Sequence, residues 1–466
     1  MRVGTAQIEI TPQPGIELSG FQVRPQPSTE VLDPLWMRAL YLDDGAEKCL
    51  WLHTDLGALE QRFADQLRRH IAMDSGLPFA RILLVATHTH SGPAVAAPPG
   101  GDAADRTAVA AEAKSAGRTL KFDGGMVEPV YVTWLEAQIR RGARLALDAP
   151  EPCRLVAVEG RCELAVDRCV PACRHPGDRP NPVHTGKPRG HCCASALQYM
   201  TIMDPRVGCW AFRRGDGSFP AVLLCYSMHP ACLCSSQISA DWPGETARVV
   251  SEALPGRPVV VVSTGACGDM NPPRVGTTPD EMRQVGRQVA QSVLSSLLAR
   301  PAGAPHEPEM PLRFRSTEVS LPCAEANVEQ VEEHAGRYLA KPAFRHLEPA
   351  VRAWRENLLG MFRCGGSPGI GAKLAVLAFG PTVMIAVNAE IFARFNTLVG
   401  ASRRFSVFTA GCANGMIGYV APAQAYEEGG YYEVERSAFS YNLPRLRKGG
   451  FELLAQQACH LLDALA

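Results

Sequence analysis

The sequence has no net charge and no long apolar run, and these two absences exclude several classes of protein. Lys plus Arg and Asp plus Glu each number 47 in 466 residues, so no overall field attracts the chain to nucleic acid or anionic lipid. No apolar run approaches the ~20 residues of a membrane-spanning helix. The chain starts with a strand-like segment, VGTAQIEITP, rather than a secretory signal. We therefore expect a cytoplasmic protein without a membrane span or a nucleic-acid partner.

Nucleotide-binding motifs and internal sequence repeats are also missing. The sequence contains neither a P-loop nor a G-x-G-x-x-G fingerprint, so nothing in it supports a nucleotide enzyme. Cysteine is plentiful, with 16 residues, but no two are spaced as a C-x2-C pair. In a large cytoplasmic chain such cysteines are mostly reduced thiols.

The hydrophobic pattern predicts alternating strands and helices. Residues 48–56 have the composition of a strand, residues 60–73 carry apolar side chains at helical spacing, and residues 81–86 return to strand. The same order recurs from residue 219 to residue 264, and Thr278 is expected to cap a further helix. This alternation predicts an α/β fold, with layered mixed β-sheets and flanking helices.

Two segments interrupt this pattern. Residues 94–125 are rich in Ala and Gly and are expected to form a flexible flap. Residues 173–193 contain many turn-forming residues and are expected to form an irregular loop. Four cysteines in and around this loop are interleaved with histidines, which leaves a second structural zinc as an alternative to incidental thiols. They are Cys169, Cys173, Cys192 and Cys193.

Polar side chains follow the apolar runs that are predicted to be strands. His88 and His90 follow one run, His229 the next, and the segment GACGDMNP a third. Glu390 and Tyr419 come after two further runs. The carboxyl ends of strands in an α/β sheet are where ligands usually bind. Histidines, a carboxylate and a phenol that meet there would suit a divalent metal, with zinc the best match.

Each residue taken alone has a simpler interpretation. Two histidines at alternate positions on a strand share one face, which could also be a hydrogen-bonded polar cluster. A single histidine before proline, as at His229, is often a turn residue. Glu390 could be a favourable charge at a helix N-terminus. Only the convergence of all of them favours a metal site.

Six segments in the same order resemble the neutral/alkaline ceramidase family. They are VGTAQIEITP, DPLWMRALYLDDG, ATHTHSGP, SADWPG, GACGDMNP and GYVAPAQAYEEGGYY. The resemblance runs to about residue 445 and implies a single zinc hydrolase domain over residues 1–466, similar to the N-terminal catalytic domain of that family. We expect a short relative without the family's secretory signal and C-terminal immunoglobulin-like domain. Members of the family are zinc-dependent amidases, and the ceramidases among them cleave N-acyl sphingoid bases.

The resemblance also implies a site. One zinc per chain is expected, bound by His88, His229, Glu390 and Tyr419. His90 is then a neighbouring group that hydrogen-bonds or transfers a proton.

The sequence departs from the family at Asn271, which stands where ceramidases carry a serine. An amide cannot be the nucleophile, so activated water has to attack, and Asn271 is expected to donate a hydrogen bond to the oxyanion. Asp269 is expected to orient the loop rather than to react.

This departure and the missing segments favour a small or soluble N-acyl amide as the substrate. Three alternatives stay open: a true ceramidase, an esterase or lactonase, and an inactive metal-binding protein. A homo-oligomer is compatible with the sequence, which does not determine the oligomeric state.

Overall fold

The computed structural model describes residues 1–21, 24, 26–95, 121–122, 125–126, 128–169, 204–299, 310–366, 369–401 and 405–465. Most of the predicted flap lies outside these residues, although its first two residues form β7 (Ala94–Val95), which pairs with β5 (Ala58–Leu59). The predicted loop at 173–193 lies outside them entirely, as do three of the four cysteines proposed for a second zinc.

Three sheets form the framework of the described structure. The first has the strand order β10-β1-β3-β4-β6, the second β11-β13-β14-β16 and the third β18-β19-β20-β22. The strands of the first sheet are β1 (Arg2–Glu9), β3 (Trp36–Asp43), β4 (Lys48–Thr54), β6 (Ile82–Ala86) and β10 (Glu151–Pro152). Those of the second are β11 (Arg154–Arg161), β13 (Arg206–Arg213), β14 (Ala221–Tyr226) and β16 (Val259–Thr264). Those of the third are β18 (Leu312–Leu321), β19 (Ile370–Phe379), β20 (Thr382–Val387) and β22 (Ser406–Ala410).

The three sheets repeat one topology. Three antiparallel strands come first, and a helix then leads to a fourth strand parallel to the third. The connecting helices are α1 (Gln61–Ser75), α5 (Asp241–Ala253) and α9 (Arg394–Gly400). The repetition is topological and leaves no repeat in the sequence, because each copy needs only strand and helix periodicity. The predicted α/β class with mixed sheets is confirmed.

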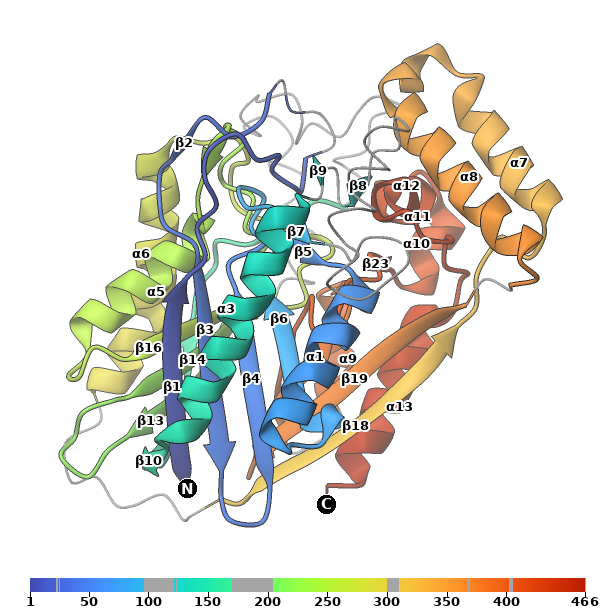
Figure 1. The fold of residues 1–466 in the computed structure, drawn as a ribbon. Coiled ribbons are helices and arrows are strands. Elements are labelled where there is room, and N and C mark those ends of the chain that lie inside the picture. The colour runs from blue at the N-terminus through green and yellow to red at the C-terminus, as the bar shows by residue number, and fades with distance from the viewer. Residues whose placement is uncertain are drawn as a thin grey trace.

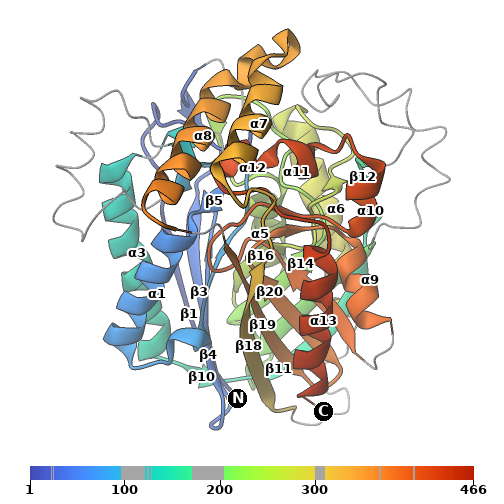
Figure 2. The same cartoon turned by 90° about the vertical axis from the view of Figure 1, so that its right-hand side faces the viewer.

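Helices cover the outer faces of the sheets (Figures 1 and 2). Helix α3 packs on β1 and β3, α6 on β11, and α13 on β18 and β19. Their bounds are α3 (Pro129–Asp148), α6 (Pro279–Leu298) and α13 (Gly450–Asp463). Two further long helices are α7 (Val328–Leu339) and α8 (Glu348–Arg363). No helix within the described ranges is both long and apolar enough to span a membrane.

Local sequence signals explain these elements well. The apolar stripe expected on α1 is buried at Phe63, Leu67 and Ile71. Thr278 caps α6 as predicted, and its side chain and that of Glu281 exchange hydrogen bonds with each other's backbone.

The apolar core is shared among the three sheets. One buried cluster contains Trp51 of the first sheet, Trp210 of the second and Phe379 of the third. The Trp210 ring lies 5.0 Å from that of Phe379, and its Nε1 donates to Thr382 Oγ1 at 3.0 Å. The indole therefore has a partner for its polar atom as well as apolar contacts.

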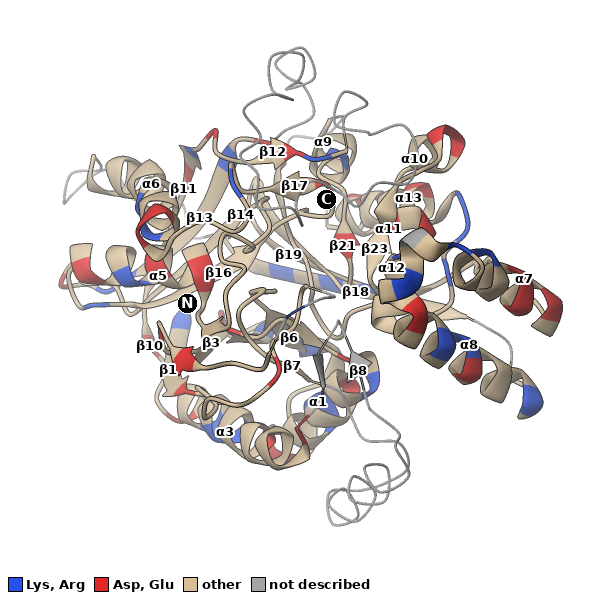
Figure 3. Cartoon of the chain, turned by 90° about the horizontal axis from the view of Figure 1, so that it is seen from above, with Lys and Arg blue, Asp and Glu red and all other residues tan. Residues whose placement is uncertain are grey.

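Helices α7 and α8 form a separate pair with its own core. Seen from above, the pair projects from one side of the sheets (Figure 3). His334 of α7 lies at its centre, 5.4 Å from the Trp354 ring of α8 and 5.2 Å from the Phe439 ring of α12 (Ser437–Tyr441). Burial lowers the pKa of His334 to about 3, so this ring is neutral in the folded protein.

The protein should lose stability in acid because of this histidine. Its pKa is lower in the folded than in the unfolded chain, so protons bind preferentially to the unfolded chain once the pH drops below about 6.5. The stability is complete above that pH and falls by about 1.4 kcal/mol per pH unit toward pH 3. The His334→Leu protein should show a smaller loss of unfolding midpoint between pH 7 and pH 4.5, measured by urea titration.

Exposed His346, replaced by leucine, is the matched control and should retain the acid sensitivity of the wild type. Some acid sensitivity should persist in the His334→Leu protein, because burial also lowers the pKa of His53 to about 4. Identical pH dependence in wild type and His334→Leu would contradict this assignment.

Candidate metal centre

Three of the four predicted ligands come from the carboxyl ends of three strands, one in each sheet. His88 follows the end of β6 by two residues, His229 follows β14 by three, and Glu390 follows β20 by three. All three side chains are at most 1% exposed. The common topology of the sheets thus brings together residues that lie 302 positions apart at most, from His88 to Glu390.

The sequence pattern predicted that the H-x-H pair lies on a strand, but both histidines lie beyond the end of β6. Strand β6 ends at Ala86, and His88 has a φ of 64° in the left-handed region. A residue other than glycine in this region costs on the order of 1–3 kcal/mol and is most often found at functional sites. The conformation is held by hydrogen bonds from the backbone N–H of His88 to Leu56 O and from its ring to Gly57 O.

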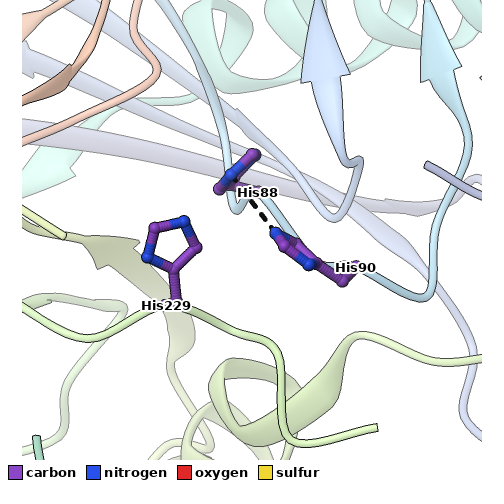
Figure 4. Close-up of side chains that lie close together, drawn as sticks. All are labelled: His88, His90 and His229. Atoms are coloured by element: carbon purple, nitrogen blue, oxygen red, sulfur yellow. Dashed lines mark hydrogen bonds between the residues drawn. The ribbon is translucent and has the colours of Figure 1, made fainter. Parts of the chain in front are cut away.

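Five polar atoms converge at the centre of the site. Glu390 Oε2 lies 3.1 Å from His88 Nε2 and 2.8 Å from His229 Nε2. Tyr419 OH is 3.5 Å from His229 Nε2, and His90 Nε2 is 3.4 Å from His88 Nε2. Donors that share a tetrahedral zinc at 2.0–2.2 Å lie about 3.3 Å from one another. The buried group of His88, His90 and His229, drawn in Figure 4, could therefore bind a metal.

The hydrogen bonds of the rings indicate that a cation belongs there. His88 Nδ1 lies 2.6 Å from Gly57 O, and His229 Nδ1 lies 3.1 Å from Met270 O. Carbonyl oxygens only accept, so each Nδ1 carries the proton. Burial lowers the pKa of His229 to about 4, which leaves the ring neutral and its Nε2 with a lone pair. His88 Nε2 and His229 Nε2 lie 3.1 and 2.8 Å from Glu390 Oε2, and a shared cation would satisfy all three atoms.

Tyr419 is held beside Glu390 by the backbone. The short strands β21 (Glu390–Ile391) and β23 (Tyr419–Val420) pair in parallel, with Glu390 opposite Tyr419. Burial, together with the charge of Glu390, holds the pKa of the Tyr419 phenol well above its ordinary value. Tyr419 is therefore the residue next to the carboxylate in the sheet.

His90 is enclosed more tightly than the sequence suggested. Its ring lies 4.8 Å from the Phe21 ring, and the backbone of Gly20 lies against its other side. A Cβ at Gly20, which has a φ of 86°, would come within 2.3 Å of the ring. Burial, and then the neighbouring His88 and His229, hold the pKa of His90 well below its usual range. The ring is therefore a neutral base.

Asn271 presents a buried donor. Arg168 NH1 donates to Asn271 Oδ1 at 3.1 Å, and because a guanidinium only donates, this contact fixes the orientation of the amide. Asn271 Nδ2 is buried and has no hydrogen-bond partner among the described residues. An unsatisfied buried N–H is costly unless it has a function. The amide thus has a buried donor available.

Asp269 connects two loops by hydrogen bonds. Its Oδ1 accepts from the backbone N–H of Ala393 at 2.7 Å, and its carbonyl accepts from that of Arg168 at 2.8 Å. Burial, and then the charge of Asp167, raise its pKa to about 8. These contacts connect the loop carrying Asn271 to the segment after Glu390.

Sequence reasoning missed Arg168 and Tyr441. Besides Asn271, Arg168 contacts Gly268 O at 2.8 Å and Glu433 Oε1 at 2.8 Å. Tyr441 OH donates to Glu390 Oε1. Neither residue has a motif around it, so only tertiary structure could identify it.

A buried ion pair supports the turn that carries His88. Asp55 accepts from Arg38 NH1 at 2.8 Å and from Thr87 Oγ1 at 2.9 Å, and both side chains of the ion pair are at most 5% exposed. Removing one partner of a buried pair strands the other charge. The Asp55→Asn protein should lose about 3–5 kcal/mol of unfolding free energy, measured as a lower urea midpoint.

The matched control is Asp74→Asn. Asp74 pairs with Arg140 at 2.8 Å on the surface, with side chains 50% and 41% exposed, and its loss should cost less than about 1 kcal/mol. Equal effects of the two substitutions would show that the Asp55 network does not support the fold.

Comparisons with known proteins agree on the fold. No family model matches the chain, and no curated protein is significantly similar to it in sequence. A neutral ceramidase from Pseudomonas aeruginosa superposes with a TM-score of 0.66 at 16% identity, covering 99% of this chain and 74% of that one. A structure described as a ceramidase complexed with C2 gives 0.65 at 16% identity, covering 99% and 75%. The chain therefore has the mixed α/β fold of the neutral ceramidases.

Proposed function

We propose that this protein is a zinc-dependent hydrolase that cleaves the C–N bond of an N-acyl amide. The observation that carries the proposal is the meeting of two imidazole Nε2 atoms with the Glu390 carboxylate at 2.8–3.1 Å. His88, His229, Glu390 and Tyr419 would hold one zinc per chain. The ceramidase-like fold supports the amidase class.

The residues of the chain have distinct roles in this proposal. Zinc, when bound, supplies Lewis acidity that lowers the pKa of water and polarises a carbonyl. His90, a neutral base beside His88, accepts the proton of the attacking water and returns it to the leaving nitrogen. Asn271 Nδ2 donates to the oxygen that becomes negatively charged. Arg168 and Asp269 keep that donor in place.

The role of His90 can be separated from that of a ligand. The His90→Ala protein should keep its zinc and lose about 10²–10⁴-fold in turnover, the usual contribution of a general base. Zinc content by elemental analysis and initial rates measure the two quantities. Loss of zinc from this variant would make His90 a ligand in place of Tyr419, and a full rate would remove it from the chemistry.

A substrate screen tests the proposal as a whole. Short N-acyl amides, matching esters and a ceramide analogue should be incubated with the protein before and after treatment with a chelator. We expect chelator-sensitive release of amine from a small or soluble amide. Cleavage of esters alone would identify an esterase, and preference for the ceramide analogue would identify a true ceramidase. Bound zinc without any hydrolysis would identify a metal-binding protein.

A further inference from the structure

We propose that Tyr441 is a positioning residue that fixes the orientation of the Glu390 carboxylate, and that the α7–α8 pair holds Tyr441 in place. The inference rests on the proposed zinc site and goes beyond it. It assigns a task to a helical pair that shares no core with the three sheets.

The two oxygens of Glu390 have different partners. Oε2 faces His88 Nε2 and His229 Nε2 at 3.1 and 2.8 Å. Oε1 accepts a hydrogen bond from Tyr441 OH. Both residues are buried. The phenol thus leaves Oε2 as the oxygen directed at the metal position, and hydrogen-bonded neighbours of this kind typically change metal affinity 10–100-fold.

Tyr441 ends the short helix α12, whose position depends on α7 and α8. Phe439, two residues earlier, packs against His334 and against Trp354 at 5.2 Å. Trp354 Nε1 donates to Leu443 O at 2.7 Å, two residues after Tyr441. Asn357 Nδ2 donates to Asn442 O at 3.0 Å. Contacts from the helical pair therefore lie on both sides of Tyr441.

The link between the helical pair and the site is continuous. Trp354 and Asn357 of α8 contact the segment 439–443, and Tyr441 in this segment donates a hydrogen bond to Glu390. A small displacement of this segment would remove the phenol from Oε1 and free the carboxylate to rotate. The helical pair thus controls the orientation of one ligand without contacting the metal position itself.

The test is zinc affinity, measured by competition with a chromophoric chelator. Tyr441→Phe removes one hydroxyl, and the zinc dissociation constant should rise about 10–100-fold. Tyr41→Phe is the matched control, because Tyr41 is also buried and its OH donates to Asp43 Oδ2 at 3.1 Å, at the end of β3 away from Asp55. The dissociation constant of this control should equal that of the wild type.

A second variant keeps the inference testable if Tyr441→Phe folds poorly. Trp354 lies on α8, and Trp354→Phe removes the N–H that donates to Leu443 O. This substitution should also raise the zinc dissociation constant, by a smaller factor than Tyr441→Phe. Unchanged zinc affinity in Tyr441→Phe, with the wild type binding zinc, would overturn this inference alone. A wild-type protein that binds no zinc would overturn the proposed function along with it.

Discussion

The His229→Ala protein should be purified with almost no zinc and should hydrolyse amides at least about 100-fold more slowly than the wild type. His229 Nε2 is the donor nearest to Glu390 Oε2, at 2.8 Å. Without this nitrogen, Glu390 loses the neutral ligand that would bind the zinc together with it. Elemental analysis and initial rates measure the two effects.

Exposed His460, replaced by alanine, serves as the control and should behave like the wild type. Circular dichroism distinguishes loss of zinc from loss of fold. A His229→Ala protein with a full complement of zinc would show that His229 is not a ligand. Among the described histidines, only His88 and His90 would then remain in this group to bind the metal.

The Asn271→Asp protein should differ from His229→Ala in its zinc content. It should keep its zinc, while its turnover falls. The carboxylate preserves the shape of the side chain and its contact with Arg168, but replaces the Nδ2 donor with an acceptor. Losing one oxyanion donor typically costs 10²–10³-fold in kcat, or about 3–4 kcal/mol. The rate at saturating substrate and the zinc content should be measured together.

Asn271→Ala should give a similar loss, since it also removes the donor. Asn271→Ser places in the chain the residue that the family resemblance implies at this position, and tests whether a hydroxyl can replace the amide as donor. If Asn271→Asp and Asn271→Ala both retain the wild-type kcat, Asn271 has no part in stabilising the oxyanion. If both lose zinc, the loop containing Asn271 supports the metal site rather than the reaction.

The sequence predicted the framework and the location of the site because both depend on periodic patterns. Strands such as β14 and β16 are continuous apolar runs, and a change to polar residues marks where each run ends. His229 and Glu390 could be found from those ends alone. Tyr419 and the segment containing Asn271 also follow such runs, but their individual roles were expected only from the family resemblance.

The geometry around these residues could not be predicted. The left-handed conformation of His88 depends on Leu56 and Gly57, which lie in the loop between β4 and β5 rather than among its own neighbours in sequence. Arg168 and Tyr441 approach the site from segments with no distinguishing pattern. Their roles depend on tertiary contacts, such as that of Arg168 with Asn271, which no local periodicity encodes.

The zinc content of the wild-type protein tests the central claim most directly. The protein should be purified without chelator, supplied with equimolar zinc, freed of unbound metal and measured by elemental analysis. The arrangement of His88, His229, Glu390 and Tyr419 predicts about one zinc per chain. A protein that is folded yet retains no zinc after this treatment would contradict the assignment of the buried histidines and Glu390 as a metal centre.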